Sequence, residues 1–176
     1  MPDRHPPMAL HRVYLSLGSN IAAAANLRSA LRALREQFGP LSVSPVYQTK
    51  AVGFEGNDFL NLAAAIVTNL DVLALNSWLH ALEDAHGRRR DQARFSARTL
   101  DIDIVFFDHL IMSGPGNLQL PRSDLEHAFV LKPLFDLNPR LVVPGTDHSL
   151  AMLWSEHKDR EAPQWNSTLR FDQSVV

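Results

Sequence analysis

The order of apolar and polar positions along the chain predicts alternating strands and helices. Residues 13–17 alternate with the two-residue period of a strand, and residues 41–49, rich in β-branched side chains, read as another. Residues 59–68 form a mostly apolar run that fits a strand or a helix, and Asn61, Val67, Thr68 and the neighbouring turn residues favour a strand. Residues 100–107 give the strongest strand pattern in the chain.

Two segments carry the spacing of amphipathic helices. Residues 22–38 place Leu27, Leu31, Leu34 and Phe38 on one face, and the pair Gly39-Pro40 ends the helix. Residues 72–86 predict a second helix, which begins after a capping Asp71 and ends at Gly87.

The resulting order is strand, helix, strand, strand, helix, strand. It is typical of an α+β fold, the ferredoxin-like sandwich, in which helices pack on one face of an antiparallel-containing sheet. Residues 108–157 add a hairpin-like insert and short helices. We expect a flexible tail over 1–11, one domain over 12–157 and a peripheral C-terminal extension over 158–176, docked by Trp165 and Phe171.

Composition narrows the class of protein. The chain has 176 residues, of which 45% are hydrophobic, and a net charge of -2, which argues against a general nucleic-acid binder. It has no cysteine, so disulfides and thiolate zinc sites are excluded. No signal peptide or membrane-length apolar run is present, so the cytoplasm is the expected location and no membrane partner is expected.

The strand over 100–107 carries the most informative chemistry. Side chains alternate between the faces of a strand, so Asp101 and Asp103 share one face and lie a few ångström apart. Two close carboxylates repel each other unless a cation lies between them, and Mg²⁺ prefers such oxygen ligands. Taken alone, two ordinary surface acids on a half-solvated strand explain the pattern as well.

The residues before this strand are rich in arginine: Arg88, Arg89, Arg90, Arg94 and Arg98. Guanidinium groups bind phosphate oxygens through paired hydrogen bonds. An arginine-rich loop followed by a carboxylate pair supplies both halves of a metal–triphosphate site, although a solvated basic loop remains the plainer reading of the arginines by themselves. Residues 18–20 lack the glycine–lysine pattern of a P-loop.

Four segments in order, 13–20, 58–62, 94–105 and 128–134, resemble the 6-hydroxymethyl-7,8-dihydropterin pyrophosphokinase family, and the likeness runs from about residue 13 to about residue 154. The resemblance implies an enzyme of folate biosynthesis, a kinase that transfers the β,γ-diphosphate of ATP to the hydroxymethyl oxygen of the pterin and releases AMP. It implies two Mg²⁺ ions, held by Asp101 and Asp103, and these two small molecules as partners. The sequence does not fix the oligomeric state, and we expect a monomer rather than an oligomer.

The resemblance also assigns the remaining site residues. Arg88 and Arg98 join the two aspartates as catalytic residues that contact the nucleotide phosphates. Beside the nucleotide lie Glu83, Arg90 and Arg94, the last two in a loop that closes over the site. Around the pterin lie Thr49, Val52, Phe59, Asn61, Phe95 and Phe129, with the ring between Phe59 and Phe129 and its edge on Asn61.

The chain departs from the family pattern between Pro121 and Phe129. Arg122 stands where the family has His, His127 stands where Arg is usual, and the spacing is one residue short. Arg122 can still contact phosphate as a permanent cation. The alternative is a divergent paralogue that binds pterin or nucleotide without turnover, and a palm-like nucleotidyl transferase is a third, more distant reading.

Overall fold

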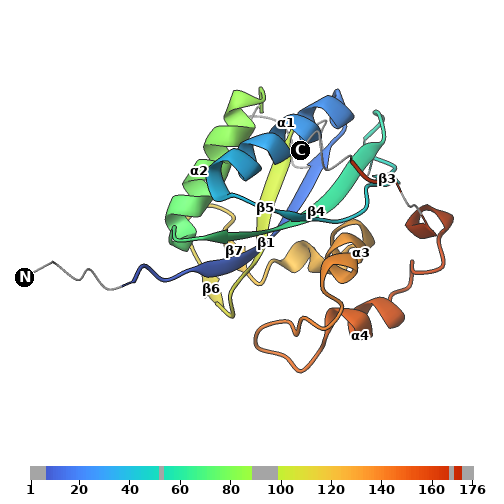
Figure 1. Cartoon of the computed structure of the whole chain (residues 1–176). Helices are drawn as coiled ribbons and strands as arrows, with labels where there is room; N and C mark the ends of the chain where they lie inside the picture. The colour runs from blue at the N-terminus through green and yellow to red at the C-terminus, as the bar shows by residue number, and fades with distance from the viewer. Residues whose placement is uncertain (1–6, 52–53, 89–98, 167–168, 172–176) are drawn as a thin grey trace, which may run out of the picture.

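The computed structural model describes residues 7–51, 54–88, 99–166 and 169–171 (Figure 1). Its centre is an antiparallel sheet in the order β2-β4-β1-β5, with β3 also paired to β4. The strands are β1 (His11–Ser19), β2 (Ser42–Val43), β3 (Tyr47–Thr49), β4 (Phe59–Thr68) and β5 (Asp101–Phe107). The α+β class predicted from the sequence is therefore confirmed, and so is the predicted order of elements, except that the strand expected over 41–49 is divided into β2 and β3.

Two long helices cover one face of the sheet: α1 (Ala23–Phe38) and α2 (Val72–Ala85). The leucines of α1 at positions 27, 31 and 34 are fully buried in this core, as their spacing predicts. Asp71 caps α2 by accepting a hydrogen bond from the backbone N–H of Ala74 at 2.8 Å. Gly39 ends α1 with φ of 82°, a left-handed value that glycine adopts without strain.

The opposite face is covered by α3 (Ala128–Leu137) and α4 (Leu150–Ser155), which pack against a second core (Figure 1). The sequence predicted helices on one face only, and here the structure differs. The physical reason is that Ala63, Ala65, Val105 and Phe106 make this face apolar as well, so it too must be covered.

Strand β5 changes its alternation halfway along. Ile102 and Ile104 face the first core, so Asp101 and Asp103 face the α3 side. The register with β1 then shifts between Tyr14 and Leu15. After this bulge Phe106 reaches the second core and Phe107 returns to the first.

Shorter elements complete the chain. The hairpin β6 (Met112–Ser113) and β7 (Gln119–Leu120) leads through the 3-10 turn η1 (Ser123–Glu126) into α3, and a second turn, η2 (Pro163–Asn166), follows α4. Trp165 and Phe171 are buried, as expected. In the described part of the chain, no helix is long and apolar enough to cross a membrane.

Candidate active site

A row of residues across the sheet joins the two predicted halves of the site. Gly18 of β1 pairs with Asp101 of β5 on one side and with Asn61 of β4 on the other, and Asn61 pairs in turn with Tyr47. Directly paired residues share a face, so the whole row faces α3. Since adjacent strands are about 4.8 Å apart, Asp101 and Asn61 lie about 10 Å from each other.

Gly18 keeps the middle of this row open. A Cβ atom at this position would lie 3.1 Å from the amide oxygen of Asn61 and 3.9 Å from Cδ1 of Phe59. The missing side chain therefore leaves a backbone floor between the acidic pair and the amide, which is what a ligand lying across β1 needs.

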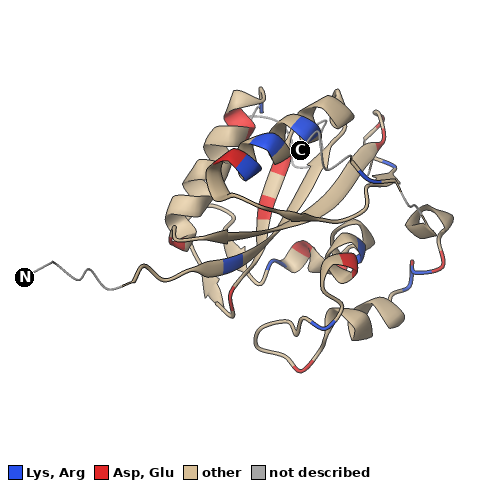
Figure 2. Ribbon diagram, in the orientation of Figure 1, with Lys and Arg blue, Asp and Glu red and all other residues tan. Residues whose placement is uncertain are grey.

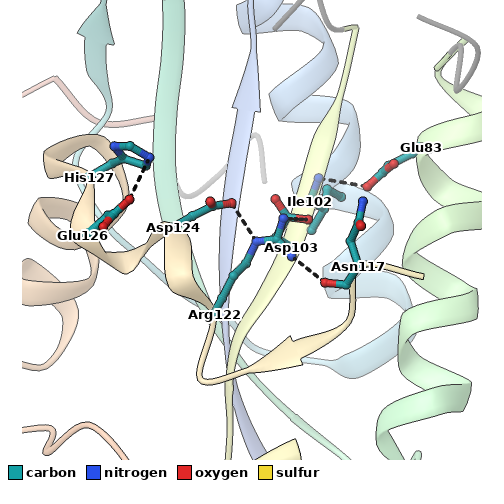
Figure 3. Close-up of polar contacts among 8 residues, drawn as sticks. All are labelled: Glu83, Ile102, Asp103, Asn117, Arg122, Asp124, Glu126 and His127. Atoms are coloured by element: carbon teal, nitrogen blue, oxygen red, sulfur yellow. Dashed lines mark hydrogen bonds and ion pairs between the residues drawn. The ribbon is translucent and has the colours of Figure 1, made fainter. Parts of the chain in front are cut away.

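Arg122 offsets the negative charge at the acidic end of the row. One guanidinium nitrogen lies 3.5 Å from Oδ1 of Asp103, and Nε donates to Oδ2 of Asp124 at 2.9 Å. Figure 3 shows Arg122 between these two carboxylates, with Asp103 on β5 and Asp124 on the turn before α3. Figure 2 shows the acidic positions along β5. The structure thus brings Arg122 to the metal-binding aspartate predicted from the sequence.

The charges around Asp103 act on its pKa in opposite directions. Burial raises the pKa of Asp103 well above its usual range, and the charge of Asp101 raises it further, while Arg122 lowers it. The side chain of Asp103 still keeps 27% of its surface exposed, so it is accessible to a ligand. Burial opposes the charge of Arg122, but Asp103 and Asp124 outweigh it and raise the pKa of the guanidinium, which therefore stays a cation.

Hydrogen bonds at the outer edge of β5 hold the strand that carries Asp101 and Asp103 in place. The backbone N–H of Ile102 donates to Oε1 of the buried Glu83 at 3.1 Å, and the N–H of Arg122 donates to the carbonyl of Val105 at 3.2 Å. An edge strand has unpaired backbone groups on one side, and these two contacts satisfy two of them. Glu83, predicted beside the nucleotide, therefore lies against the strand that carries the aspartates.

Arg88 follows α2, and its backbone N–H donates to the carbonyl of Glu83 at 3.1 Å. Its Nε and one terminal nitrogen are buried, and no described residue accepts a hydrogen bond from them. Buried donors without a partner are costly. An anion such as phosphate would satisfy them, in agreement with the predicted role of Arg88.

The residues predicted to bind the pterin lie at the other end of the row. The amide of Asn61 donates to the hydroxyl of Thr49 at 2.8 Å, and Phe59, half-buried, meets Phe54 edge-on. Phe129, at the start of α3, stacks on His127 with ring centres 5.1 Å apart. Thr49 and Phe129 line one hollow of about 570 Å³.

Five predicted residues lie outside the described residues, so the structure does not place them: Val52, Arg90, Arg94, Phe95 and Arg98.

Other residues of the site were missed by sequence reasoning. The hydroxyl of Ser19 donates to the carbonyl of Thr99, just before β5, at 2.6 Å, and the amide of Asn20 donates to the carbonyl of Asn57, just before β4, at 3.1 Å. These contacts tie the turn after β1 to both halves of the site. Asp124 was missed as well. Its only sequence signal was an acid two residues after Arg122.

The residues present fit magnesium. The described residues contain no group of three His, Cys, Asp or Glu side chains that could hold a metal ion. A site for Mg²⁺ does not require one, because this ion keeps several waters and takes phosphate oxygens alongside one or two carboxylates. Asp101 and Asp103, which share one face of β5, offer such a pair of carboxyl groups.

Fold and site together define a class of protein: a small α+β domain in which a carboxylate pair on an edge strand lies beside a guanidinium group, with an amide and aromatic side chains two strands away. The model of the 7,8-dihydro-6-hydroxymethylpterin-pyrophosphokinase family matches residues 14–139. The chain belongs to this family, which makes it a pyrophosphokinase of folate synthesis.

Two relatives in the family are similar over most of their length. A Pseudomonas aeruginosa 2-amino-4-hydroxy-6-hydroxymethyldihydropteridine pyrophosphokinase is 38% identical over 147 residues, which is 79% of this chain and 88% of that protein. The protein of the same name from Methylorubrum extorquens is 40% identical over 138 residues, 76% of this chain and 87% of its own.

Solved structures share the fold. The chain superposes on a Plasmodium falciparum HPPK-DHPS crystal structure with a TM-score of 0.69 at 14% identity. The match covers 94% of this chain and 44% of that chain, so this chain spans less than half of the Plasmodium protein.

Proposed function

We propose that this chain transfers the β,γ-diphosphate of ATP to 6-hydroxymethyl-7,8-dihydropterin in a Mg²⁺-dependent reaction at the Asp101–Gly18–Asn61 row. The observation that carries the proposal is this row, because one antiparallel register aligns a carboxylate pair, an open glycine and an amide on a single face. The spacing of about 10 Å across two strands suits a pterin at one end and a triphosphate at the other.

In the transfer, the hydroxymethyl oxygen forms a bond to the β-phosphorus and its proton is released to solvent. The bond from that phosphorus to the oxygen that bridges the α-phosphorus breaks, and AMP leaves with the electron pair. Two Mg²⁺ ions held by Asp101 and Asp103 would supply charge neutralisation for the phosphates. We expect Arg88 and Arg122 to neutralise further phosphate charge, because Arg122 lies beside Asp103 and the buried donors of Arg88 have no partner among the described residues.

The acceptor is oriented by the other end of the row. Phe59 and Phe129 offer aromatic faces for a flat heteroaromatic ring, and Asn61 offers an amide to its hydrogen-bonding edge. Thr49 fixes the Asn61 amide through the 2.8 Å hydrogen bond. Catalysis then rests mainly on positioning two bound substrates, without a nucleophile supplied by the protein.

The test is AMP release from ATP and Mg²⁺ with and without the pterin, with the pterin diphosphate detected by mass. We expect pterin-dependent AMP in the unaltered protein and a loss of at least about 100-fold in Asp101→Ala and Asp103→Ala, because each removes an anionic ligand. Asp108→Asn, at the exposed far end of the same segment, is the matched control and keeps full activity. Full activity in either alanine variant would contradict the metal assignment.

A second candidate is a protein that binds pterin or nucleotide without turnover. The observation that favours it is Arg122, since its guanidinium already neutralises Asp103. Absence of turnover in the unaltered protein, together with pterin binding measured by calorimetry, would select this candidate.

The strand order also supports our proposal that the core is a ferredoxin-like sandwich. Strands β1 and β4 are central and the two strands that complete the helical crossovers, β2 and β5, lie at the edges.

A further inference from the structure

The C-terminal segment, defined here as residues 150–166, packs against the acceptor end of the site. It comprises α4 and η2 and contacts α3 and β3 (Figure 1). Nothing in the reaction described above gives it a role. Its contacts converge on Lys132 of α3 and Tyr47 of β3. The same two elements carry Phe129 and Thr49, which line the hollow of about 570 Å³.

Lys132 forms the centre of these contacts. Its ammonium lies 2.6 Å from Oδ1 of Asp136, and it lies 5.0 Å from the ring centre of Phe135 and 5.7 Å from those of Tyr47 and Trp154. Only 14% of the side chain is exposed. A cation with so little exposure to water needs compensating interactions. Here they are one ion pair with a carboxylate and cation–π contacts with three aromatic rings.

Asp136 carries the connection to the sheet. Its second oxygen accepts a hydrogen bond from the hydroxyl of Tyr47. Burial and the neighbouring carboxylate raise the pKa of Tyr47, so the phenol stays protonated and remains a donor. Because Tyr47 is paired with Asn61, this contact ties α3 to the strand that carries the acceptor amide.

Trp165 contacts both Tyr47 and Trp154. Its ring meets Tyr47 edge-on at 5.6 Å and Trp154 edge-on at 5.9 Å. It is 6% exposed, and it lines the same hollow as Thr49 and Phe129. Its indole N–H is buried, and none of the described residues accepts a hydrogen bond from it. A purely apolar side chain would pack here without that cost. The buried indole N–H therefore argues that the tryptophan ring itself is needed at this position.

We propose that Lys132, Trp154 and Trp165 are positioning residues for the pterin acceptor. Phe129 lies one helical turn before Lys132, and Thr49 lies two residues after Tyr47 on the same face. The contacts of Lys132, Trp154 and Trp165 therefore fix the distance between Phe129 on α3 and the side chains of Asn61 on β4 and Thr49 on β3. This inference rests on the proposed function, because it assigns the acceptor to the space between them.

The experiment compares Trp165→Ala and Lys132→Met with the unaltered protein. Lys132→Met keeps the chain length and the ring contacts but removes the charge, so it remains informative if Trp165→Ala does not fold. We expect each variant to raise the KM and the calorimetric Kd of the pterin about fivefold to tenfold, because a small displacement of a positioning wall has a large effect. The KM of ATP changes less than about twofold, and Trp165→Phe restores much of the loss.

Trp78→Ala is the matched control, since that ring packs edge-on against Phe38 in the first core, away from the site. It should lower Tm comparably and leave the KM of the pterin unchanged. Variants of Trp165 and Lys132 that lower Tm but leave pterin binding within about twofold would overturn the inference. Failure of the proposed function gives a different result, because the unaltered protein would then form no pterin diphosphate, whatever the Kd values of the variants.

Discussion

Arg122 shows how a single residue can balance an acidic site before any ligand is bound. Its guanidinium spans Asp103 and Asp124, and the carbonyl of Asn117 lies within 3.4 Å of another of its nitrogens. A histidine, usual in the family at this place, has one ring and titrates near neutral pH, so it could not hold both carboxylates permanently. In this chain the guanidinium has Asp124 as a second partner besides Asp103.

Removal of this cation should have opposite effects on metal and nucleotide. In Arg122→Met we expect Mg²⁺ alone to bind about tenfold more tightly, since a competing positive charge near Asp103 is lost. The ATP analogue with a methylene group between the α- and β-phosphates should bind about tenfold more weakly, since a phosphate contact is lost. Calorimetry of both ligands checks this, with Arg140→Met, at the exposed end of the molecule beyond α3, as the control. Changes of the same sign for both ligands would contradict this role of Arg122.

Asp108 offers a residue-scale test of pH dependence away from the site. Burial is the largest single influence and raises the pKa of Asp108, but hydrogen bonds from His11 at 2.7 Å and from the backbone N–H of Arg12 at 2.8 Å, with the charge of His11, together outweigh it and lower the pKa. A lowered pKa in the folded state means stabilisation at neutral pH that disappears as pH falls through that pKa. Thermal unfolding from pH 7 to about pH 3 should show Asp108→Asn a few degrees less stable at pH 7 and equal to the unaltered protein at the acid end. A difference in Tm that is independent of pH would exclude this origin.

At the scale of elements, periodicity and caps predicted the helices closely, because each helix contains its own signals. The strand predicted over 41–49 is instead divided into β2 and β3. Pro45 lacks the N–H that a continuous ladder needs, and Ser44 replaces it by exchanging hydrogen bonds with Ala63 through its backbone and its hydroxyl. The break turns Tyr47 and Thr49 toward the α3 side of the sheet.

The pairing of β1 with β4 predicts a specific role for Gly18. In Gly18→Ala the new methyl would lie 3.1 Å from the amide oxygen of Asn61, so the amide must move. We expect the KM of the pterin to rise about fivefold or more, while the Kd of the ATP analogue changes less. Steady-state kinetics with each substrate varied in turn measures both. The control is Gly87→Ala on the far side of the sheet, where no described atom lies within 4 Å of the added carbon and the cost is one of backbone strain. An unchanged pterin KM in Gly18→Ala would show that the open floor is not needed.

At the scale of the whole molecule, the site draws on segments from Gly18 to Phe129, so ligand binding and global stability must be linked. With Mg²⁺ and the α,β-methylene analogue at about 100 times Kd, the free energy of unfolding should rise by about 2.7 kcal/mol. Differential scanning calorimetry should show a higher Tm that disappears when EDTA is added. The same rise in Tm with and without EDTA would mean that the nucleotide binds without the metal.

The sequence by itself determined the element order, the helix ends, the carboxylate pair on one face of a strand, and the family likeness. These depend on local spacing, which is written in consecutive residues. Tertiary structure alone decided that Asp101, Gly18 and Asn61 form one row, that Arg122 reaches Asp103, and that Trp165 packs on Tyr47. Each of these depends on strand register or on contacts between residues far apart in the chain, and no local pattern specifies them. The second helical layer was likewise decided by packing, because an apolar sheet face can be covered by any suitable segment that the chain returns to it.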